Sequence, residues 1–140
     1  DKKLEQFRKS GKLIESRSYD TIHGVWTYFT ADDGQVDLEK ADYLGIGTLE
    51  SYCRMKEYYG KDKVLPIYIQ VEDGERLQRA LIREKKQDNP KYAEMCRRFL
   101  ADQEDFSEEH IREAGIEIRF VNDDLDNCVR NIIKYINSVT

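Results

Sequence analysis

Residues 116–136 read IEIRFVNDDLDNCVRNIIKYI, and this stretch decides the fold class. It begins with β-branched and aromatic residues, which predict a strand over 116–121. It continues with apolar residues at helical spacing, which predict a helix that turns one stripe toward the core. That stripe consists of Leu125, Cys128, Val129, Ile132, Ile133 and Ile136. A strand followed directly by a helix is the building unit of α/β folds.

Two earlier segments repeat this pattern. Residues 43–47 (YLGIG) and 64–71 (VLPIYIQV) are short apolar runs, each followed by a stretch of helical character, 49–60 and 75–87. Such runs suit strands that are buried on both faces of a parallel sheet. We therefore expect an α/β protein with an open, mostly parallel sheet and flanking helices. Three strands are few for such a sheet, so its first strand is expected to be missing from this chain.

The N-terminal part has a different, β-rich character. A short amphipathic helix is predicted over 3–10, where a glycine ends it. Residues 12–19 and 25–30 then predict the two strands of a hairpin, which forms an insert beside the main sheet. Further helices are predicted over 90–105 and over 107–115, where a serine provides the N-cap.

Composition narrows the class of protein. The chain has 140 residues, 23 Lys and Arg, 28 Asp and Glu, and a net charge of −5. No apolar run approaches the roughly 18 residues of a membrane span, and the basic excess of a nucleic-acid binder is missing. The opening residues do not read as a signal peptide. Three widely spaced cysteines without a metal-binding motif indicate reduced thiols. A cytoplasmic protein is expected.

Three segments carry a resemblance to a known family. The first is GKLIE at 11–15, and the second is the arginine set Arg83, Arg97 and Arg98. The third is VNDDLD at 121–126. In this order and spacing they resemble the guanylate kinases, P-loop nucleoside monophosphate kinases that transfer a phosphoryl group from ATP to GMP. The resemblance covers nearly the whole chain and implies a P-loop kinase-like fold.

The resemblance implies a nucleotide-binding enzyme built from four parts. They are a β-rich GMP-binding subdomain at 1–40, an α/β core segment at 41–75, a helical lid at 76–106 and the C-terminal part of the core at 107–140. The implied partners are GMP and ATP, with neither nucleic acid nor a membrane. The implied oligomeric state is a monomer or a homodimer.

The resemblance also implies roles for particular residues. The lid arginines would be catalytic, because planar guanidinium groups meet the oxygens of a moving phosphoryl group bidentately. They are Arg83, Arg97 and Arg98. The implied GMP-binding residues are Glu15, which reads the guanine edge, with Trp26, Tyr28 and Gly47, and the implied ATP-binding residues are Asn122 and Asp123. Mg²⁺ would arrive with ATP, with its ligands mostly outside this chain and no metal-binding residue assigned within it.

Two departures from the family stand out. The phosphate-binding loop, GxxxxGK[ST], does not occur, and the GK at 11–12 lacks the rest of that motif. We expect the loop upstream of Asp1, so the chain by itself is expected to be inactive. Gly45 and Gly47 stand where the family has two aspartates, which leaves the acceptor specificity open.

Each assignment has a structural alternative. Glu15 could be a solvated strand residue paired with Arg17 or a lysine, and Trp26 and Phe29 could be core residues of the small domain. The lid arginines could lie on an exposed helix face that serves no ligand. Asn122 and Asp123 could act as helix caps, a role that is compatible with ligand binding.

Function has alternatives too. Guanylate kinase-like domains also occur as non-catalytic protein-interaction modules, and the two glycines in place of aspartates favour that reading. A related kinase for another phosphorylated ribose compound is a further possibility. The lid arginines and the VNDDLD segment favour the enzyme.

Overall fold

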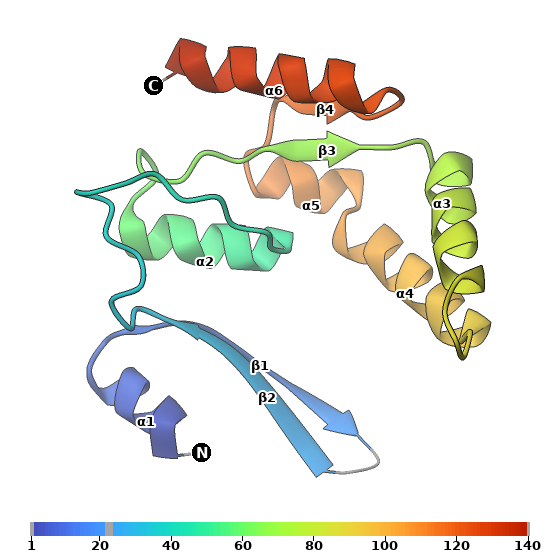
Figure 1. Cartoon of the computed structure of the whole chain (residues 1–140). Helices are drawn as coiled ribbons and strands as arrows, with labels where there is room; N and C mark the ends of the chain where they lie inside the picture. The colour runs from blue at the N-terminus through green and yellow to red at the C-terminus, as the bar shows by residue number, and fades with distance from the viewer. Residues whose placement is uncertain (1, 22–23, 140) are drawn as a thin grey trace. The chain divides into compact units, whose positions relative to one another are not determined.

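The computed structural model describes residues 2–21 and 24–139. This part of the chain is a mixed α/β structure with six helices and two small sheets of two strands each (Figure 1). The chain divides into two compact units, Asp1–Val64 and Leu65–Thr140. Each unit is described by itself. The division at residue 64 falls inside the segment that was predicted as one α/β core part, 41–75.

The first unit contains a β-hairpin with two helices. Its elements are α1 (Lys2–Lys9), β1 (Leu13–Thr21), β2 (Gly24–Ala31) and α2 (Leu49–Tyr59). The predicted helix and hairpin are thus confirmed, while residues 22 and 23 of the predicted turn lie outside the described residues. Gly11 has a φ of 70° just after α1. This left-handed conformation is one that glycine adopts readily, which is why the helix ends there.

The strand register sorts the hairpin side chains onto two faces. Glu15 pairs with Thr30, Arg17 with Tyr28 and Tyr19 with Trp26 in the antiparallel ladder. Directly opposed residues share a face, and successive residues alternate between faces. One face therefore carries the Glu15, Arg17, Tyr28 and Trp26 positions.

The opposite hairpin face packs on the first helix. Phe29 lies on that face and its ring contacts Phe7 of α1, with 6.0 Å between the ring centroids. Ser18 and Thr27 form a hydroxyl pair on the same face, 2.8 Å apart. With α1 against one face, the other face is left for contacts with α2.

The strand predicted over 43–47 does not form. These residues have no regular secondary structure, and the side chains of Leu44 and Ile46 are fully exposed, at 93% and 102%. A strand needs a partner for its backbone groups, and this segment has none among the described residues. The parallel layer accordingly has two strands here instead of the expected three.

The second unit combines four helices with a pair of short strands. Its elements are β3 (Tyr68–Gln70), α3 (Asp73–Lys85), α4 (Tyr92–Asp105), α5 (Glu108–Glu113), β4 (Arg119–Val121) and α6 (Leu125–Val139). All correspond to predicted elements, although both strands are shorter than expected. The helix predicted from residue 90 begins only at Tyr92.

The two strands of this unit pair in parallel. Tyr68, Ile69 and Gln70 face Arg119, Phe120 and Val121, and α6 packs on β4 (Figure 1). Their carboxyl ends lie at the same edge, because the strands run in the same direction. The general prediction of an α/β fold holds, and the sheet is a two-stranded ribbon in the described residues.

The core of the second unit lies around α5, β4 and the inner side of α6. Ile111 is 1% exposed and Cys128 is 2% exposed, and the ring of Phe120 lies 5.5 Å from that of Tyr135. Ser107 caps α5, as predicted, by accepting a hydrogen bond from the amide of His110.

The apolar stripe of α6, predicted to face the core, is only partly buried. Cys128 is buried, but Leu125, Val129 and Ile133 are 65%, 44% and 51% exposed. A sheet of two short strands is too narrow to cover the whole stripe.

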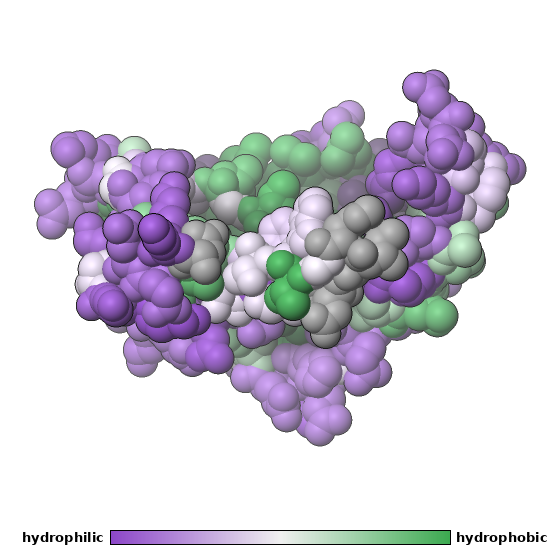
Figure 2. Space-filling view, turned by 90° about the horizontal axis from the view of Figure 1, so that it is seen from below, coloured by the Kyte–Doolittle hydropathy of each residue, from purple (hydrophilic) through white to green (hydrophobic). Residues whose placement is uncertain are grey.

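Hydrophobic residues are also visible elsewhere at the surface. The space-filling view shows hydrophobic groups among the hydrophilic residues that dominate it (Figure 2). None of the helices in the described part of the chain combines the length and the apolar character that a membrane crossing requires.

Candidate functional site

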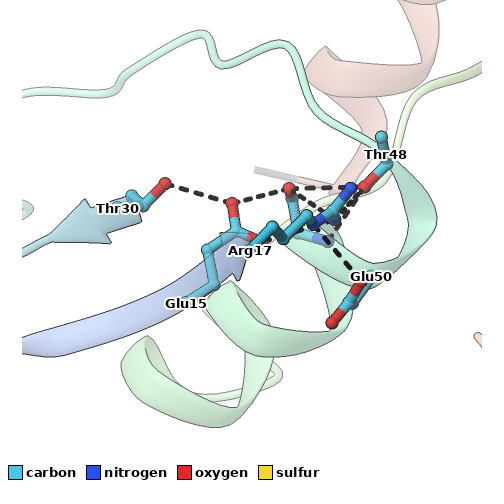
Figure 3. A network of polar contacts seen from close by, with 6 residues as sticks. Glu15, Arg17, Thr30, Thr48 and Glu50 are labelled. Carbon is cyan, nitrogen blue, oxygen red and sulfur yellow. Dashed lines mark hydrogen bonds and ion pairs between the residues drawn. The ribbon is translucent and has the colours of Figure 1, made fainter. Parts of the chain in front are cut away.

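Glu15 lies at the centre of a polar network in the first unit (Figure 3). Its side chain is only 13% exposed. The carboxylate oxygen Oε1 accepts hydrogen bonds from the hydroxyls of Thr30, at 3.1 Å, and Ser51, at 2.7 Å. The alternative of a solvated residue is therefore wrong, because donors from β2 and α2 enclose this carboxylate.

Arg17 connects the same carboxylate to the first turn of α2. Its Nη2 lies 3.4 Å from Glu15 Oε2 and donates to the hydroxyl of Thr48. Its Nε lies 3.3 Å from the carboxylate of Glu50 (Figure 3). The suggested Glu15–Arg17 pair is thus present, as one contact of a larger network.

The N-cap of α2 belongs to the same polar network. Thr48 is the N-cap, and its hydroxyl accepts from the backbone N–H of Ser51 at 3.3 Å. This cap places the Ser51 side chain on the first turn, where it reaches Glu15.

Gly47 permits close packing just before this helix. A β-carbon at that position would lie 3.0 Å from Ser51 Cβ, so Ser51 would have to shift slightly to admit a side chain there. The predicted role of Gly47 in GMP binding stays a prediction.

Two aromatic residues extend the network along the same hairpin face. Tyr28 is the ladder partner of Arg17, and Trp26 lies two residues further along β2. Their side chains are 60% and 53% exposed, so Trp26 is not a core residue. Flat, exposed rings beside a carboxylate and a guanidinium can stack on a planar ring whose edge carries hydrogen-bonding groups.

A shallow groove of about 430 Å³ runs beside Glu15, between β1 and α2. It is lined by Leu13, Ile14, Glu15, Ser16, Glu50, Arg54, Glu57 and Tyr58. Desolvation, followed by a hydrogen bond to Asp32, raises the pKa of Tyr58 above its ordinary value, so its hydroxyl keeps its proton at neutral pH.

The charges of the network favour a ligand that donates hydrogen bonds. Glu15 and Glu50 contribute two carboxylates against the one guanidinium of Arg17. The network therefore repels a phosphate and attracts N–H groups. An edge of a heterocyclic base meets that requirement, while its phosphate has to be bound elsewhere.

The predicted lid arginines lie in the second unit on two neighbouring helices. Arg97 donates to Glu94 from Nε and Nη2, both at 2.8 Å, and Arg98 Nε donates to the same carboxylate at 2.9 Å. These hydrogen bonds lower the pKa of Glu94 to about 2. Arg83 is exposed at the end of α3, and no side-chain hydrogen bond or ion pair of Arg83 is found among the described residues.

Helices α3 and α4 contact each other through a cation–π interaction and a hydrogen bond. Arg76 of α3 lies over the ring of Phe99, with 4.3 Å between its guanidinium carbon and the ring centroid. It also donates to Gln103 of α4 at 2.7 Å. The arginines of α3 and α4 therefore belong to one helical hairpin.

Three hydrogen bonds stabilise the turn after β4. The Asn122 amide donates to the carbonyl of Gln70 at 2.9 Å, and the Asn122 carbonyl accepts from Arg79 Nη2 at 3.1 Å. Asp123 accepts from the amide of Asp124 at 2.8 Å.

The capping residue of α6 differs from the two residues that were suggested. Asp124 takes this role by accepting from the amide of Asn127 at 2.7 Å. It stands directly before Leu125, the first residue of α6. Asn122 and Asp123 lie too far upstream to reach that amide.

The structure brings some of the predicted site residues together and adds others. Glu15, Tyr28 and Trp26 share one hairpin face, whereas the lid arginines and Asn122 belong to the other unit. Ser51, Thr30 and Thr48 were not anticipated as site residues. The local signal was Thr48 as a residue type that caps helix N-termini, and it gives no indication of a contact with Glu15.

Comparisons with family models, with curated proteins and with solved structures gave no match to this chain. Among the residues that the structure describes, no group of three or more His, Cys, Asp and Glu is placed to hold a metal ion. The site is therefore interpreted from its own geometry.

Proposed function

We propose that this chain is part of a guanylate kinase-like nucleotide phosphotransferase, which converts ATP and GMP to ADP and GDP in the full-length protein. The observation that carries the proposal is the shared hairpin face of Glu15, Tyr28 and Trp26. It combines a carboxylate that accepts N–H bonds with exposed rings that stack on a base. A nucleobase is the common ligand that uses both.

Glu15 is the base-reading residue in this proposal. Its carboxylate is held by donors from two elements, so it is oriented before a ligand arrives. A preorganised acceptor loses little conformational entropy when the base binds. The groove of about 430 Å³ beside it is within the size range of small-molecule sites.

The arginines of α3 and α4 are the proposed phosphate-binding residues. Arg83, Arg97 and Arg98 are exposed, and lie on helices that pack as a hairpin. The proposal assigns these guanidinium groups to the oxygens of the transferred phosphoryl group, which planar guanidinium groups bind bidentately. Glu94 holds Arg97 and Arg98 until an anionic phosphate competes for them.

The turn after β4 supplies the proposed ATP-side contact. It lies at the carboxyl edge of the parallel pair, where ligands of open α/β sheets bind. Arg79 and Gln70 fix the backbone of Asn122, so this segment presents a defined shape. None of the described residues is assigned to Mg²⁺.

Base recognition is tested by calorimetric titration of the 140-residue chain with GMP. Replacing Glu15→Gln removes one negative charge and an acceptor, so the affinity should fall at least tenfold. The matched control is Glu117→Gln, an exposed glutamate of the other unit, which should bind as the wild type does. Unchanged affinity in Glu15→Gln would remove Glu15 from the base site.

Catalysis is tested on protein that includes the region upstream of Asp1. A coupled assay of ADP release with GMP, dGMP, AMP and UMP should give turnover with a guanine nucleotide. If none of the four monophosphates is turned over, the chain is no kinase of these acceptors.

The non-catalytic interaction module remains the second candidate, because one observation favours it. Leu44 and Ile46 are fully exposed in the segment where Gly45 and Gly47 replace the family's aspartates. An exposed apolar segment is suited to binding another protein. GMP binding without any turnover would favour this candidate over the enzyme.

A further inference from the structure

We propose that the Glu15 network reads a 6-oxopurine through a single ring N–H, so that it binds hypoxanthine nucleotides as tightly as guanine nucleotides. This inference rests on the proposed function and specifies its substrate class. Guanine presents two adjacent donors on that edge, a ring N–H and an exocyclic amino group, whereas hypoxanthine presents the ring N–H alone. The number of acceptor positions left on Glu15 decides between them.

One oxygen of Glu15 is already fully used. A carboxylate has about four lone-pair positions, two on each oxygen. Oε1 accepts from Thr30 at 3.1 Å and from Ser51 at 2.7 Å, which takes both positions of that oxygen. A base that needs both oxygens at once would have to displace one of these hydroxyls.

The Ser51 hydroxyl is held in its donating direction. Its oxygen lies 3.4 Å from Nη2 of Arg17 and 3.4 Å from the hydroxyl of Thr48, and both of these groups donate to it. A hydroxyl has one proton, and with donors on its oxygen that proton points to Glu15. Turning it away for a ligand would break this chain of hydrogen bonds, in which each bond strengthens the next.

The other oxygen keeps room for one more donor. Among the described residues, the contact of Oε2 is the one to Arg17, which at 3.4 Å is longer than the normal range for a charged pair. One ring N–H therefore completes the carboxylate. Ser51 limits the number of donors that Glu15 accepts, and the second carboxylate of the network, Glu50, is paired with Nε of Arg17 at 3.3 Å.

The experiment compares GMP and IMP by calorimetry on the 140-residue chain. The wild type should bind the two nucleotides with affinities within about threefold. In Ser51→Ala one position of Oε1 becomes vacant, so the amino group of guanine gains an acceptor. GMP should then bind at least tenfold more tightly than IMP, the usual value of a hydrogen bond to a charged group.

The matched control is Ser18→Ala, on the opposite hairpin face, where the hydroxyl contacts Thr27. It should leave the ratio of the two affinities unchanged. A wild type that prefers GMP at least tenfold, or an unchanged ratio in Ser51→Ala, would overturn the inference. If Ser51→Ala does not fold, the wild-type ratio decides alone.

The calorimetric titrations distinguish failure of the proposed function from failure of this inference. If the wild type binds neither nucleotide, or if Glu15→Gln binds both as the wild type does, the base site itself is wrong and the inference is overturned with it. If Glu15→Gln loses both nucleotides while Ser51→Ala changes nothing, only the single-donor inference is overturned.

Discussion

Glu94 and Glu15 differ in where their hydrogen-bond donors lie along the chain. Glu94 accepts hydrogen bonds from Arg97 and Arg98, three and four residues further along the same helix. Glu15 accepts from Thr30 and Ser51, which come from other elements. The first arrangement follows from helical spacing, because residues three and four apart are neighbours on a helix surface. The second exists only once the hairpin and α2 have packed together.

The titration of Glu94 provides a test at this scale. Hydrogen bonds from the two arginines lower its pKa from 4.5 to about 2. A lowered pKa in the folded state means that the interaction contributes to stability above pH 4.5 and is lost as the pH falls toward 2. We expect the side-chain carboxyl signal of Glu94 in an NMR titration to have its midpoint near pH 2.

The double variant Arg97→Ala, Arg98→Ala provides the control. Without the two donors, the midpoint for Glu94 should move up toward 4.5. A midpoint that stays near 2 in this variant would show that another cause lowers the pKa. The same variant should lose the phosphate-facing contacts of the proposed lid.

At the scale of elements, short segments depend on their caps and on single buried side chains. α5 has six residues, too few to be stable in isolation. Ser107 caps its first turn, and Gly115 follows it with a φ of 74°. Ile111, 1% exposed, attaches it to the core of the second unit. The helix is therefore held by this contact more than by its own propensity.

Replacing Ile111→Ala should reduce the free energy of unfolding by about 2–5 kcal/mol, since it removes buried methyl groups and leaves a cavity. Chemical denaturation measures the change. Leu100→Ala, at a position that is 68% exposed, should change it by no more than about 0.5 kcal/mol. If Ile111→Ala does not fold, Ile111→Val should cost about 0.5–1.5 kcal/mol. Equal effects at positions 111 and 100 would contradict the assigned core.

At the scale of the whole molecule, much of the apolar surface is not covered. Leu44, Ile46 and Leu125 are among the large apolar residues that are more than half exposed in the described part of the chain. Some exposed apolar surface is normal for a folded protein, but contiguous patches usually mark interaction sites. The segment 43–47 is the clearest case, because both of its aliphatic side chains are fully exposed.

The double variant Leu44→Ser, Ile46→Ser tests this exposure. The native chain should bind the dye ANS, which reports accessible apolar surface. The variant should bind less dye and keep its free energy of unfolding within about 0.5 kcal/mol, because neither side chain packs on a neighbour. Asp42→Ser, directly before this segment, should change neither property. A large loss of stability in the double variant would show that these side chains are buried in solution.

Most helices and the hairpin could be predicted because their signals are local. The serine before α5, the glycine after α1 and the apolar spacing of α6 act within a few residues of the elements they define. The strand at 43–47 was predicted from apolar character alone, which does not supply a hydrogen-bonding partner. The predicted core-facing stripe of α6 is only partly buried for a related reason, since burial depends on how much sheet is present to cover it.

By itself, the sequence determined the order and type of most elements and the presence of a carboxylate, aromatic rings and arginines, whose resemblance to a guanylate kinase pattern stays a prediction. Only the tertiary structure decided that Glu15 is enclosed by Thr30, Ser51 and Arg17. These residues are separated along the chain by up to 36 positions. Hydrogen bonds are directional and short, so which groups meet depends on the packing of whole elements, and no spacing within one element encodes it.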